Sequence, residues 1–497
     1  MSKHLHFKNV KSVFRFLQRN DGSLSAKTIR STSWVGATSV ITNLLSLIRG
    51  IILARLLTPE IFGLMSICLV VIRGVEIFTE TGFGTALIHR QKNYEEEKDT
   101  AFTLMVIRGF CLAIFTVVIA PFVAEYYEKP ILDIILKIIA ISFILNGAYN
   151  INTIGLQKDL DFKRLSYLAQ LVNIINFVIV VTLAFILRNI WALVIGHVAS
   201  CSVGTIMSFT MIPGKPRLRL DFKIARQLFS YGKFITGLTI VIFITTEIDN
   251  ILIGKILGMT ALGYYVLAYS LANIPATHIS KVISGVLFPA YSKLQDNLPA
   301  LQNAFLSVLK LVSVICIPVA AGLAVLAPEI IRVVYGDKWL PAAGALIILS
   351  IFGCIRSLGA LNGYLYNAIG KPNITFYSNL LKLLVILILI YPLTERYGLV
   401  GASIAVTGPI VVQYILEIYV LGKVIKLTYF KIIEGLIVPP IYSVIMCSVV
   451  FFLKNKFSSI NAYELAILIG VGVLTYFLLS HREIVFHIKK FKSIMQD

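Results

Sequence analysis

A stretch near the start of this chain recurs about 200 residues later, and each copy continues an apolar segment long enough to span a membrane. The first copy covers 51–63 and the second covers 251–263, so that Arg55 corresponds to Lys255 and Gly63 to Gly263. A weaker similarity links 145–155 with 361–370. Two similar membrane-spanning halves with a pathway between them are typical of transporters.

The composition excludes a soluble protein. Of the 497 residues, 57% are hydrophobic and 14% are charged, and the mean hydropathy is +0.85. The sequence therefore predicts an all-α integral membrane protein. We expect fourteen transmembrane helices, over 31–57, 61–86, 101–123, 131–151, 167–187, 190–212, 229–254, 261–288, 303–325, 341–369, 373–393, 398–422, 432–453 and 463–480.

Lys and Arg concentrate in 1–30, 213–228 and 481–497, which predicts that these segments and both termini are cytoplasmic. Helices 1–6 match helices 7–12, and because six is even both halves enter the membrane in the same direction. The predicted organisation is a basic N-terminal segment (1–30), a six-helix N-lobe (31–212), a linker (213–228), a six-helix C-lobe (229–424), and helices 13 and 14 with a cytoplasmic tail (425–497). Within 1–30 the apolar residues Phe7, Val10, Phe14 and Leu17 predict an amphipathic surface helix.

Charged residues inside the predicted spans are the candidate functional residues, because each costs about 2.5–3.5 kcal/mol at mid-membrane unless it has a partner or faces water. Lys137 and Lys233 lie near span ends and are expected to reach the interface. Arg73, Arg356 and Lys382 lie near mid-span. The candidate substrate-binding residues are Arg49, Arg73, Arg108, Lys281, Lys310 and Arg356.

Four acids within the spans are the candidates for gating or ion coupling: Glu76, Glu80, Glu247 and Asp249. Arg73, Glu76 and Glu80 share a helical face and can pair with one another. At the repeat offset Asp249 corresponds to Arg49, so we expect these two to pair across the cleft between the lobes. Nine cations in the spans against these four acids predict a cationic cavity that suits an anionic substrate.

Motifs for ATP-driven transport or catalysis are missing. None of the five Gly-Lys pairs is followed by Ser or Thr, and HExxH does not occur. Asp159 and Asp161 form a DxD pattern in a short loop, where nearby Lys and Arg balance them. The six cysteines form no CxxC pair. We therefore predict no enzyme activity, no cofactor and no metal, and transport driven by an ion gradient or by substrate flow. The positive charge is a topology signal facing lipid, which argues against nucleic acid.

Three segments resemble signatures of a known family. The stretch 52–63 is similar to the first-repeat signature of bacterial polysaccharide flippases, 249–268 resembles the second, and 288–295 resembles the motif that closes their helix 8. The likeness is greatest to the Wzx-type branch that exports colanic-acid and teichuronic-acid units, within the multidrug/oligosaccharidyl-lipid/polysaccharide superfamily. The residues that match the motifs are Arg55, Asp249, Lys255 and Pro289.

The resemblance implies two six-helix lobes plus two helices, in the bacterial plasma membrane. It implies a substrate of undecaprenyl-pyrophosphate-linked oligosaccharide, moved from the inner to the outer leaflet for surface polysaccharide, with a polymerase and chain-length machinery as possible partners. The alternatives are an ion-coupled drug or cation antiporter of the same superfamily, and a lipid II flippase. A membrane-embedded polymerase or ligase is disfavoured because the longest predicted extracytoplasmic loop is short.

Overall fold

The computed structural model describes residues 24–78, 94–158, 161–457 and 460–494, although side chains in parts of α2, α3, α5, α11, α13 and α19 are outside the description. Within these ranges every regular element is a helix. The first half contains α2 (Leu24–Leu56), α3 (Pro59–Phe78), α5 (Tyr94–Tyr126), α6 (Ile131–Ile139), α7 (Ile141–Gly147), α8 (Asn152–Lys158), α9 (Phe162–Leu187) and α10 (Trp191–Met211). The predicted surface helix in 1–30 falls mostly outside the described residues.

The second half contains α11 (Phe222–Ile256), α12 (Gly258–Ala272), α13 (Ile274–Leu294), α14 (Leu298–Val325), α15 (Ala327–Ile330), η1 (Ile331–Tyr335), η2 (Asp337–Ala342), α16 (Ala343–Ala368) and α17 (Pro372–Val424), followed by α18 (Tyr429–Lys454) and α19 (Ala462–Ile494). Among the described residues, eight helices are long and apolar enough to cross a membrane, or nine if a pair bent by 55° counts as one span. The chain is a multi-pass membrane protein, and the count of fourteen remains a prediction.

Several predicted helices are broken by local backbone geometry. The predicted span 131–151 divides at Ala140 into α6 and α7. The predicted span 261–288 divides at Asn273, so that Pro275 stands in the first turn of α13, where its missing N–H is not needed. At Gly398 (φ 56°, ψ −135°) α17 changes direction, which separates the two spans predicted there.

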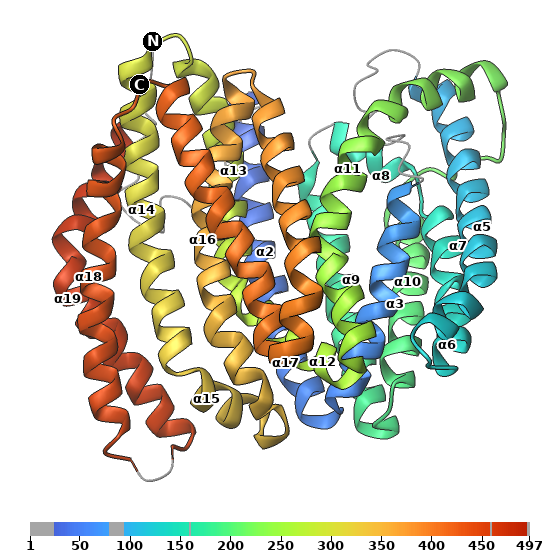
Figure 1. Ribbon diagram of the computed structural model, residues 1–497. Coiled ribbons are helices and arrows are strands. Elements are labelled where there is room, and N and C mark those ends of the chain that lie inside the picture. Colours follow the sequence, from blue (N-terminus) through green and yellow to red (C-terminus); the bar gives the residue numbers. More distant parts are fainter. Residues whose placement is uncertain (1–23, 79–93, 159–160, 458–459, 495–497) are drawn as a thin grey trace.

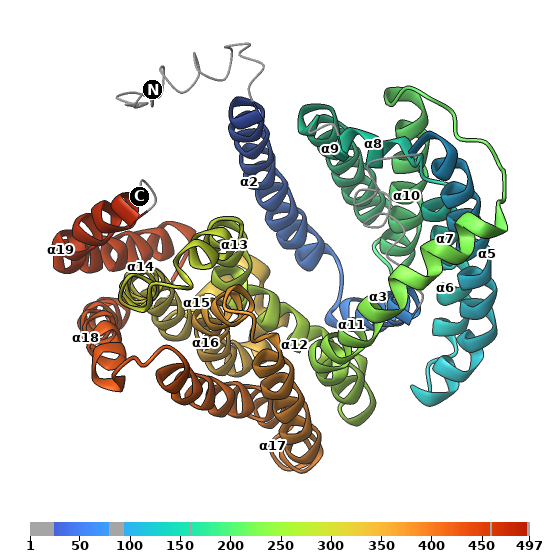
Figure 2. The same cartoon turned by 90° about the horizontal axis from the view of Figure 1, so that it is seen from above.

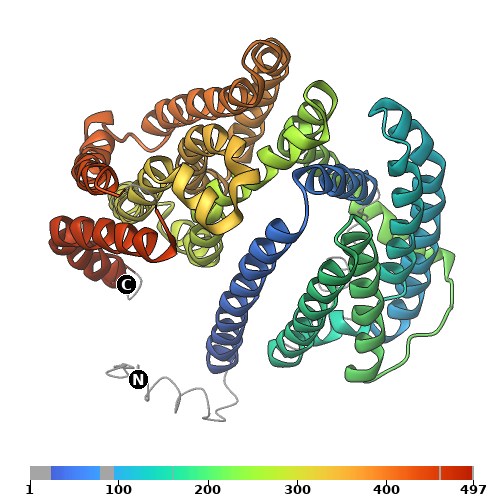
Figure 3. The ribbon, with the colours of Figure 1, turned by 90° about the horizontal axis from the view of Figure 1, so that it is seen from below.

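The helices form two groups when viewed along the bundle (Figure 2). Helices α3 and α5–α10 lie together, and α12–α19 lie on the other side. Figure 3 shows the same grouping from below, where α2 and α3 meet the second group. One hydrophobic core joins the halves, since Leu64 and Ile67 of α3 belong to the same buried cluster as Leu262 of α12 and Leu346 of α16.

The segment between the halves is held against the start of α5. The Arg217 N–H donates to Asp99 Oδ1 (3.0 Å) and the Asp221 N–H to Thr100 Oγ1 (3.3 Å). Asp221 also caps α11 by accepting from the Lys223 and Ile224 amides. The helix therefore begins at Phe222, inside the predicted linker 213–228. The N-terminal end of α11 is in this way tied to the first half.

Candidate functional site

An ion pair joins the two halves between α3 and α11. Arg73 Nη1 lies 2.7 Å from Glu247 Oε1, and the side chains are 59% and 9% exposed, respectively. Asn250 Nδ2 donates to the other carboxylate oxygen of Glu247 at 2.8 Å. The two helices approach closely beside this pair, because a Cβ at Gly74 would lie 3.1 Å from Phe243 Cζ. Arg73 was predicted as a substrate-binding residue that could also pair with Glu76 and Glu80 of its own helix, and Glu247 as a gating or coupling acid; their pairing with each other was not predicted.

Asp249 lies two residues after Glu247 in α11 and is also buried. Tyr265 OH of α12 donates to Asp249 Oδ2 at 2.7 Å, and Asp249 is 4% exposed. Arg49 instead donates to Asn176 Oδ1 of α9, within the first half. The predicted Arg49–Asp249 pair is therefore absent from this conformation. The repeat offset shows which residues of the two halves are equivalent. Equivalent residues contact each other only if they lie near the axis that relates the halves, and Arg49 and Asp249 do not make such a contact.

A polar cavity of about 300 Å³ lies within the second half. Arg356, Lys382, Asp249 and Glu417 line it, from α16, α17 and α11. Arg356 Nη1 donates to Tyr269 OH (2.9 Å) and Asn273 Oδ1 (3.1 Å). Its two cations and two carboxylates balance, so this cavity lacks a positive surplus.

Glu417 is a buried acid that the sequence analysis missed. It accepts from Ser378 Oγ (2.8 Å), Gln413 Nε2 (2.9 Å) and Asn362 Nδ2 (3.1 Å). The residue lies inside the predicted span 398–422, and its position there was the available signal. Asp133 lies inside the span 131–151 and pairs with Lys137 at 2.8 Å. The predicted spans also contain Glu434, Glu464 and the cation Arg55, so a full count lowers the surplus of in-span cations from five (9 − 4) to two (10 − 8).

The remaining candidate residues are dispersed. Arg108 Nη2 donates to the Glu76 carbonyl at 3.0 Å, so α5 meets α3 one turn from Arg73. Lys310 lies against α18, because a Cβ at Gly435 would be 3.2 Å from Lys310 Cε. The structure does not gather these cations into one group. The side chains of Lys233 and Lys281, and the whole of Glu80, lie outside the described part of the chain.

The repeat-related residues Arg55 and Lys255 each reach into the opposite half. Arg55 Nε donates to the Val334 carbonyl (2.8 Å), and Lys255 Nζ lies 2.8 Å from Glu128 Oε1. Lys255 lowers the pKa of the Glu128 carboxyl below its ordinary value, first by donating this hydrogen bond to the carboxylate and also by its positive charge. Both contacts lie at the end where α2 gives way to α3 and α11 to α12, the lower end in Figure 1.

Lys338 and Trp339 of η2 also contact the first half. We call the five residues Arg55, Glu128, Lys255, Lys338 and Trp339 the interhalf clasp. Lys338 Nζ donates to the Arg55 and Leu57 carbonyls, both at 2.8 Å, and Trp339 Nε1 donates to the Ala54 carbonyl at 2.8 Å. The Trp339 side chain is fully buried. Its ring packs edge-on against Phe62 of α3, with the centroids 5.0 Å apart. The clasp thus joins the halves through both hydrogen bonds and apolar packing.

Glycines allow the clasp to close. A Cβ at Gly63 would lie 1.9 Å from the Met259 carbonyl oxygen, and a Cβ at Gly263 would lie 1.9 Å from the Pro59 carbonyl oxygen. The two glycines occupy equivalent repeat positions, so the crossing of α3 and α12 is nearly symmetric. Pro289, from the third motif segment, lies inside α13, where the nearby Tyr291 is fully buried.

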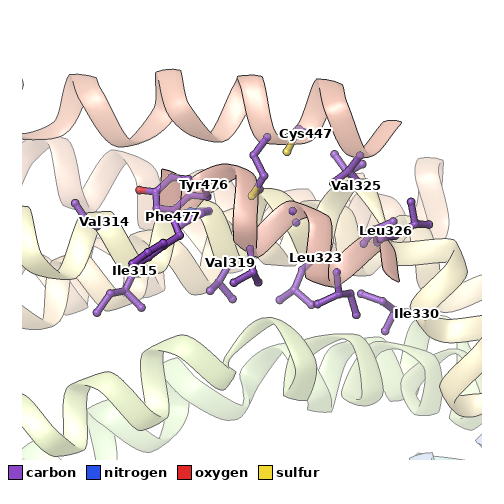
Figure 4. A pocket seen from close by; sticks show the side chains of 18 of the residues that line it. Val314, Ile315, Val319, Leu323, Val325, Leu326, Ile330, Cys447, Tyr476 and Phe477 are labelled. Atoms are coloured by element: carbon purple, nitrogen blue, oxygen red, sulfur yellow. The ribbon is translucent and has the colours of Figure 1, made fainter. Parts of the chain in front are cut away.

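An apolar cavity of about 460 Å³ lies between α14, α18 and α19. Figure 4 shows its aliphatic and aromatic lining, with Val319 and Leu323 from α14 and with Tyr476 and Phe477 from α19. The two helices that lie outside the sequence repeat contribute to its walls. Such a lining suits hydrocarbon rather than sugar.

Asp161 has a structural role in the described part of the DxD loop. It caps α9 by accepting from the Arg164 amide at 3.3 Å and also pairs with the Arg164 guanidinium. The loop charges therefore balance as the sequence analysis expected for Arg164. Asp159 lies outside the described residues.

Comparison with known proteins places these observations in a family. Residues 52–344 match the model of the polysaccharide biosynthesis protein family. The teichuronic acid biosynthesis protein TuaB of Bacillus subtilis (strain 168) is 28% identical over 81% of this chain and 85% of the relative. The lipopolysaccharide biosynthesis protein WzxC of Escherichia coli (strain K12) is 25% identical over 84% of this chain and 85% of the relative.

Solved structures show the same fold at low sequence identity. The lipid II flippase MurJ, in an inward closed conformation, superposes with a TM-score of 0.73 at 16% identity, covering 90% of this chain and 99% of MurJ. An inward-facing multidrug resistance MATE family transporter of the MOP superfamily superposes with a TM-score of 0.60 at 15% identity, covering 80% of this chain and 99% of that protein.

Proposed function

This chain belongs to the polysaccharide biosynthesis protein family, which confirms the resemblance seen in its sequence, and we propose that it is a flippase for lipid-linked oligosaccharides. In this proposal it moves undecaprenyl-pyrophosphate-linked repeat units from the cytoplasmic to the outer leaflet of a bacterial plasma membrane. The names of TuaB and WzxC, both polysaccharide biosynthesis proteins, support a precursor of surface polysaccharide as the cargo.

The exposed side chain of Arg73 at the junction of the halves carries the proposal. It is 59% exposed and held by a Glu247 carboxylate that is 9% exposed. An incoming molecule therefore meets the cation rather than the acid. A guanidinium offers five donors in a planar fork that suits phosphate oxygens. A pyrophosphate is the part of the proposed cargo that such a group would hold.

The clasp supports alternating access. It closes the halves at the end away from the C-terminal end of α19 (Figure 1). With both termini cytoplasmic, as the distribution of Lys and Arg predicts, the clasp is the extracytoplasmic closure. Cargo would enter from the cytoplasmic side, and the clasp would open to release it. The polar sugars would thus avoid the hydrocarbon interior.

The lipid part of the cargo needs an apolar surface that remains continuous with the bilayer. The lining of the cavity between α14, α18 and α19 is suited to hydrocarbon (Figure 4). A polyprenyl chain is hydrocarbon throughout, so it can pass between the bilayer and this lining without meeting polar groups. An apolar cavity in a protein with an exposed interhalf cation is consistent with a cargo that is both lipid and anion.

Two other functions remain as alternatives. An ion-coupled drug or cation antiporter would favour exposed acids and aromatic residues, whereas Glu247 and Asp249 are buried here. A lipid II flippase would carry the same pyrophosphate-lipid chemistry, so the site does not separate it from our proposal. The structural likeness to MurJ shows the fold and leaves the cargo undetermined.

Deletion of the gene in its source strain tests the proposal. We expect a complete lipid-linked repeat unit to accumulate in the cytoplasmic leaflet and surface polysaccharide to be lost, as measured by lipid extraction and a leaflet-specific glycan assay. A plasmid-borne copy should restore both. Unchanged lipid-linked sugars and intact polysaccharide, in a strain without a second exporter, would contradict the flippase and direct attention to drug efflux. Loss of viability would favour lipid II.

A further inference from the structure

We propose that the segment joining the two halves is a membrane-surface site for anionic phospholipids. The segment is 215–226, which we call the basic strap, and the headgroups are those of the leaflet that faces the cytoplasm. Headgroups bound there would hold the start of α11 against the first half. The proposal goes beyond the proposed function, because it concerns the bilayer around the protein rather than the cargo.

The basic strap lies on the outer edge of the first half. Helix α10 is long and apolar enough to cross a membrane and ends at Met211, and α11 begins at Phe222. Between them the chain is not helical, and it runs along the outer side of α5 before it enters α11 (Figure 1, Figure 2). Because the strap closely follows the end of a span, its natural surroundings are the lipid headgroups.

Main-chain hydrogen bonds hold the strap to α5. The Arg217 N–H donates to Asp99 Oδ1 at 3.0 Å, and the Arg219 N–H donates to Thr103 Oγ1 at 2.9 Å. In both bonds the strap contributes a backbone amide. The guanidinium groups of the two arginines are therefore not needed to hold the strap in place.

The strap carries an excess of exposed positive charge. Its acid, Asp221, is used at the start of α11, where the carboxylate accepts from the Lys223 and Ile224 amides. The net charge of the twelve residues is +4 (5 − 1). All five cations are exposed, and none of them has an ion-pair partner among the residues that the structure describes: Lys215, Arg217, Arg219, Lys223 and Arg226. Their charge is therefore available to a ligand.

Large apolar side chains alternate with these cations. Phe222 is 80% exposed, Leu218 is 71% exposed and Leu220 is 38% exposed. In an extended chain successive side chains point to opposite sides, so Leu218 and Leu220 share a side that Arg217 and Arg219 do not. Exposed aromatic and aliphatic groups beside cations are typical of segments that lie in a membrane interface. The apolar side would face the acyl chains, and the cations would lie level with the phosphates.

Anionic phospholipid is the occupant that fits both features. The planar fork of a guanidinium suits phosphate oxygens, and basic segments beside membrane spans attract anionic headgroups. A zwitterionic lipid offers the apolar contact without the net charge. The pyrophosphate of the cargo is compact, whereas the five cations are spread over twelve residues. Several headgroups with one charge each therefore match the strap better than one pyrophosphate does.

Headgroups on the strap would also act on the arrangement of the halves. The five cations repel one another along the strap, and bound anions would remove this repulsion. The strap would then keep its bonds to Asp99 and Thr103 of α5 more firmly. Because α11 follows the strap directly and is the first helix of the second half, anionic lipid would favour the arrangement of the halves in this structure.

Hydrogen–deuterium exchange of the strap amides tests the proposal without any cargo. Full-length protein is reconstituted into phosphatidylcholine vesicles and into vesicles that also contain phosphatidylglycerol, and exchange of peptides covering 215–226 is followed by mass spectrometry. We expect phosphatidylglycerol to slow the exchange several-fold, because bound headgroups stabilise the amide bonds of Arg217 and Arg219 to α5. High salt should remove the difference, since it screens contacts between exposed charges.

Matched variants test whether the charges of the strap cause the slowing. The strap variant should exchange equally fast in both kinds of vesicle; it combines Lys215→Gln, Arg217→Gln and Arg219→Gln. The control variant loses the same charge from exposed positions of the second half and should keep the slowing; it combines Lys293→Gln, Lys371→Gln and Lys431→Gln. If the strap variant fails to fold, the two kinds of vesicle and the effect of salt on the unaltered protein still decide the matter.

Equal exchange of the unaltered protein in the two kinds of vesicle would overturn the proposal and direct attention to an acidic protein partner. Slowing that persists in the strap variant would overturn it as well. Undecaprenyl pyrophosphate in place of phosphatidylglycerol, at equal surface charge, should slow the exchange less. Slowing by the same factor would assign the strap to the cargo and overturn the phospholipid site. None of these results bears on the flippase proposal, because no transport is measured.

Discussion

At the scale of single residues, the structure separates charges that organise the second half from charges that are available to cargo. Glu417 is buried at 7% exposure and satisfied by three donors from α16 and α17. Arg73 is largely exposed, and among the described residues its charged partner is Glu247. Depth within a span cannot make this distinction, because depth gives neither the face of the helix nor the neighbour on that face. For the same reason Arg73 and Lys310 were both predicted as substrate-binding residues from their depth in a span, although Lys310 packs against α18 and not at the junction of the halves.

We predict that Glu417→Gln destabilises the protein. The Gln side chain replaces one acceptor oxygen with an NH₂ group that faces existing donors, and an unsatisfied buried donor costs about 1–3 kcal/mol. Thermal unfolding in detergent should therefore show a lower transition temperature. Glu434→Gln, at an exposed position of α18, is the matched control and should stay within about 0.5 kcal/mol of the unaltered protein. Equal transition temperatures for both variants would contradict the network.

At the scale of helices, the repeat carries structural information that the individual spans lack. Gly63 and Gly263 occupy equivalent positions in the repeat. Gly63 lets α3 approach the backbone of α12 at Met259, and Gly263 lets α12 approach the backbone of α3 at Pro59. The sequence predicted that equivalence but could not predict the contact. The sequence prediction missed the helix breaks at Ala140 and Asn273 because the residues on both sides of each break are apolar, so hydropathy continues across it.

We predict that Gly63→Ala pushes α3 and α12 apart. The added Cβ would lie 1.9 Å from a backbone oxygen, which cannot move as a side chain can, and overpacking of this kind costs about 1–3 kcal/mol or more. Stability and transport should both fall. Gly470→Ala in α19, where a Cβ meets nothing within 4 Å, should be neutral or slightly stabilising. A Gly63→Ala protein with normal stability would argue against the close crossing.

The clasp provides a reporter of its own opening. With Trp34 and Trp191 replaced by Phe, the fully buried Trp339 becomes the sole tryptophan. We expect poor quenching by acrylamide without cargo and stronger quenching when pyrophosphate lipid is present. Glu128→Gln should raise the quenching without cargo, because Lys255 loses its charged partner. Equal quenching in every condition would contradict the role of the clasp.

Acid should weaken the same contact. The pKa of the Glu128 carboxyl is lowered by Lys255, so this contact is present above the ordinary carboxylate pKa and is lost as pH falls through the lowered value, below about 4. Quenching of Trp339 should rise over that range in the unaltered protein. It should not rise in Glu128→Gln, which has no carboxylate to titrate at this position.

At the scale of the whole molecule, an all-helical membrane fold with internal repetition followed from hydropathy and from the repeat. The functional arrangement did not. The predicted Arg49–Asp249 pair joins residues that are equivalent in the repeat, whereas the two ion pairs described between the halves, Arg73–Glu247 and Lys255–Glu128, join residues that are not. Packing of α3 on α11 decides which side chains meet, and this packing depends on both halves together.

The flipping of a pyrophosphate-linked oligosaccharide by the reconstituted protein tests the central claim most directly. Proteoliposomes are loaded with fluorescent undecaprenyl-pyrophosphate oligosaccharide, and its transfer between leaflets is measured with a membrane-impermeant quencher. We predict transfer well above that of protein-free liposomes, strongly reduced by Arg73→Gln and retained by Asp133→Asn. Transfer no faster than in protein-free liposomes, or unaffected by Arg73→Gln, would contradict the proposal that the interhalf cation carries the cargo.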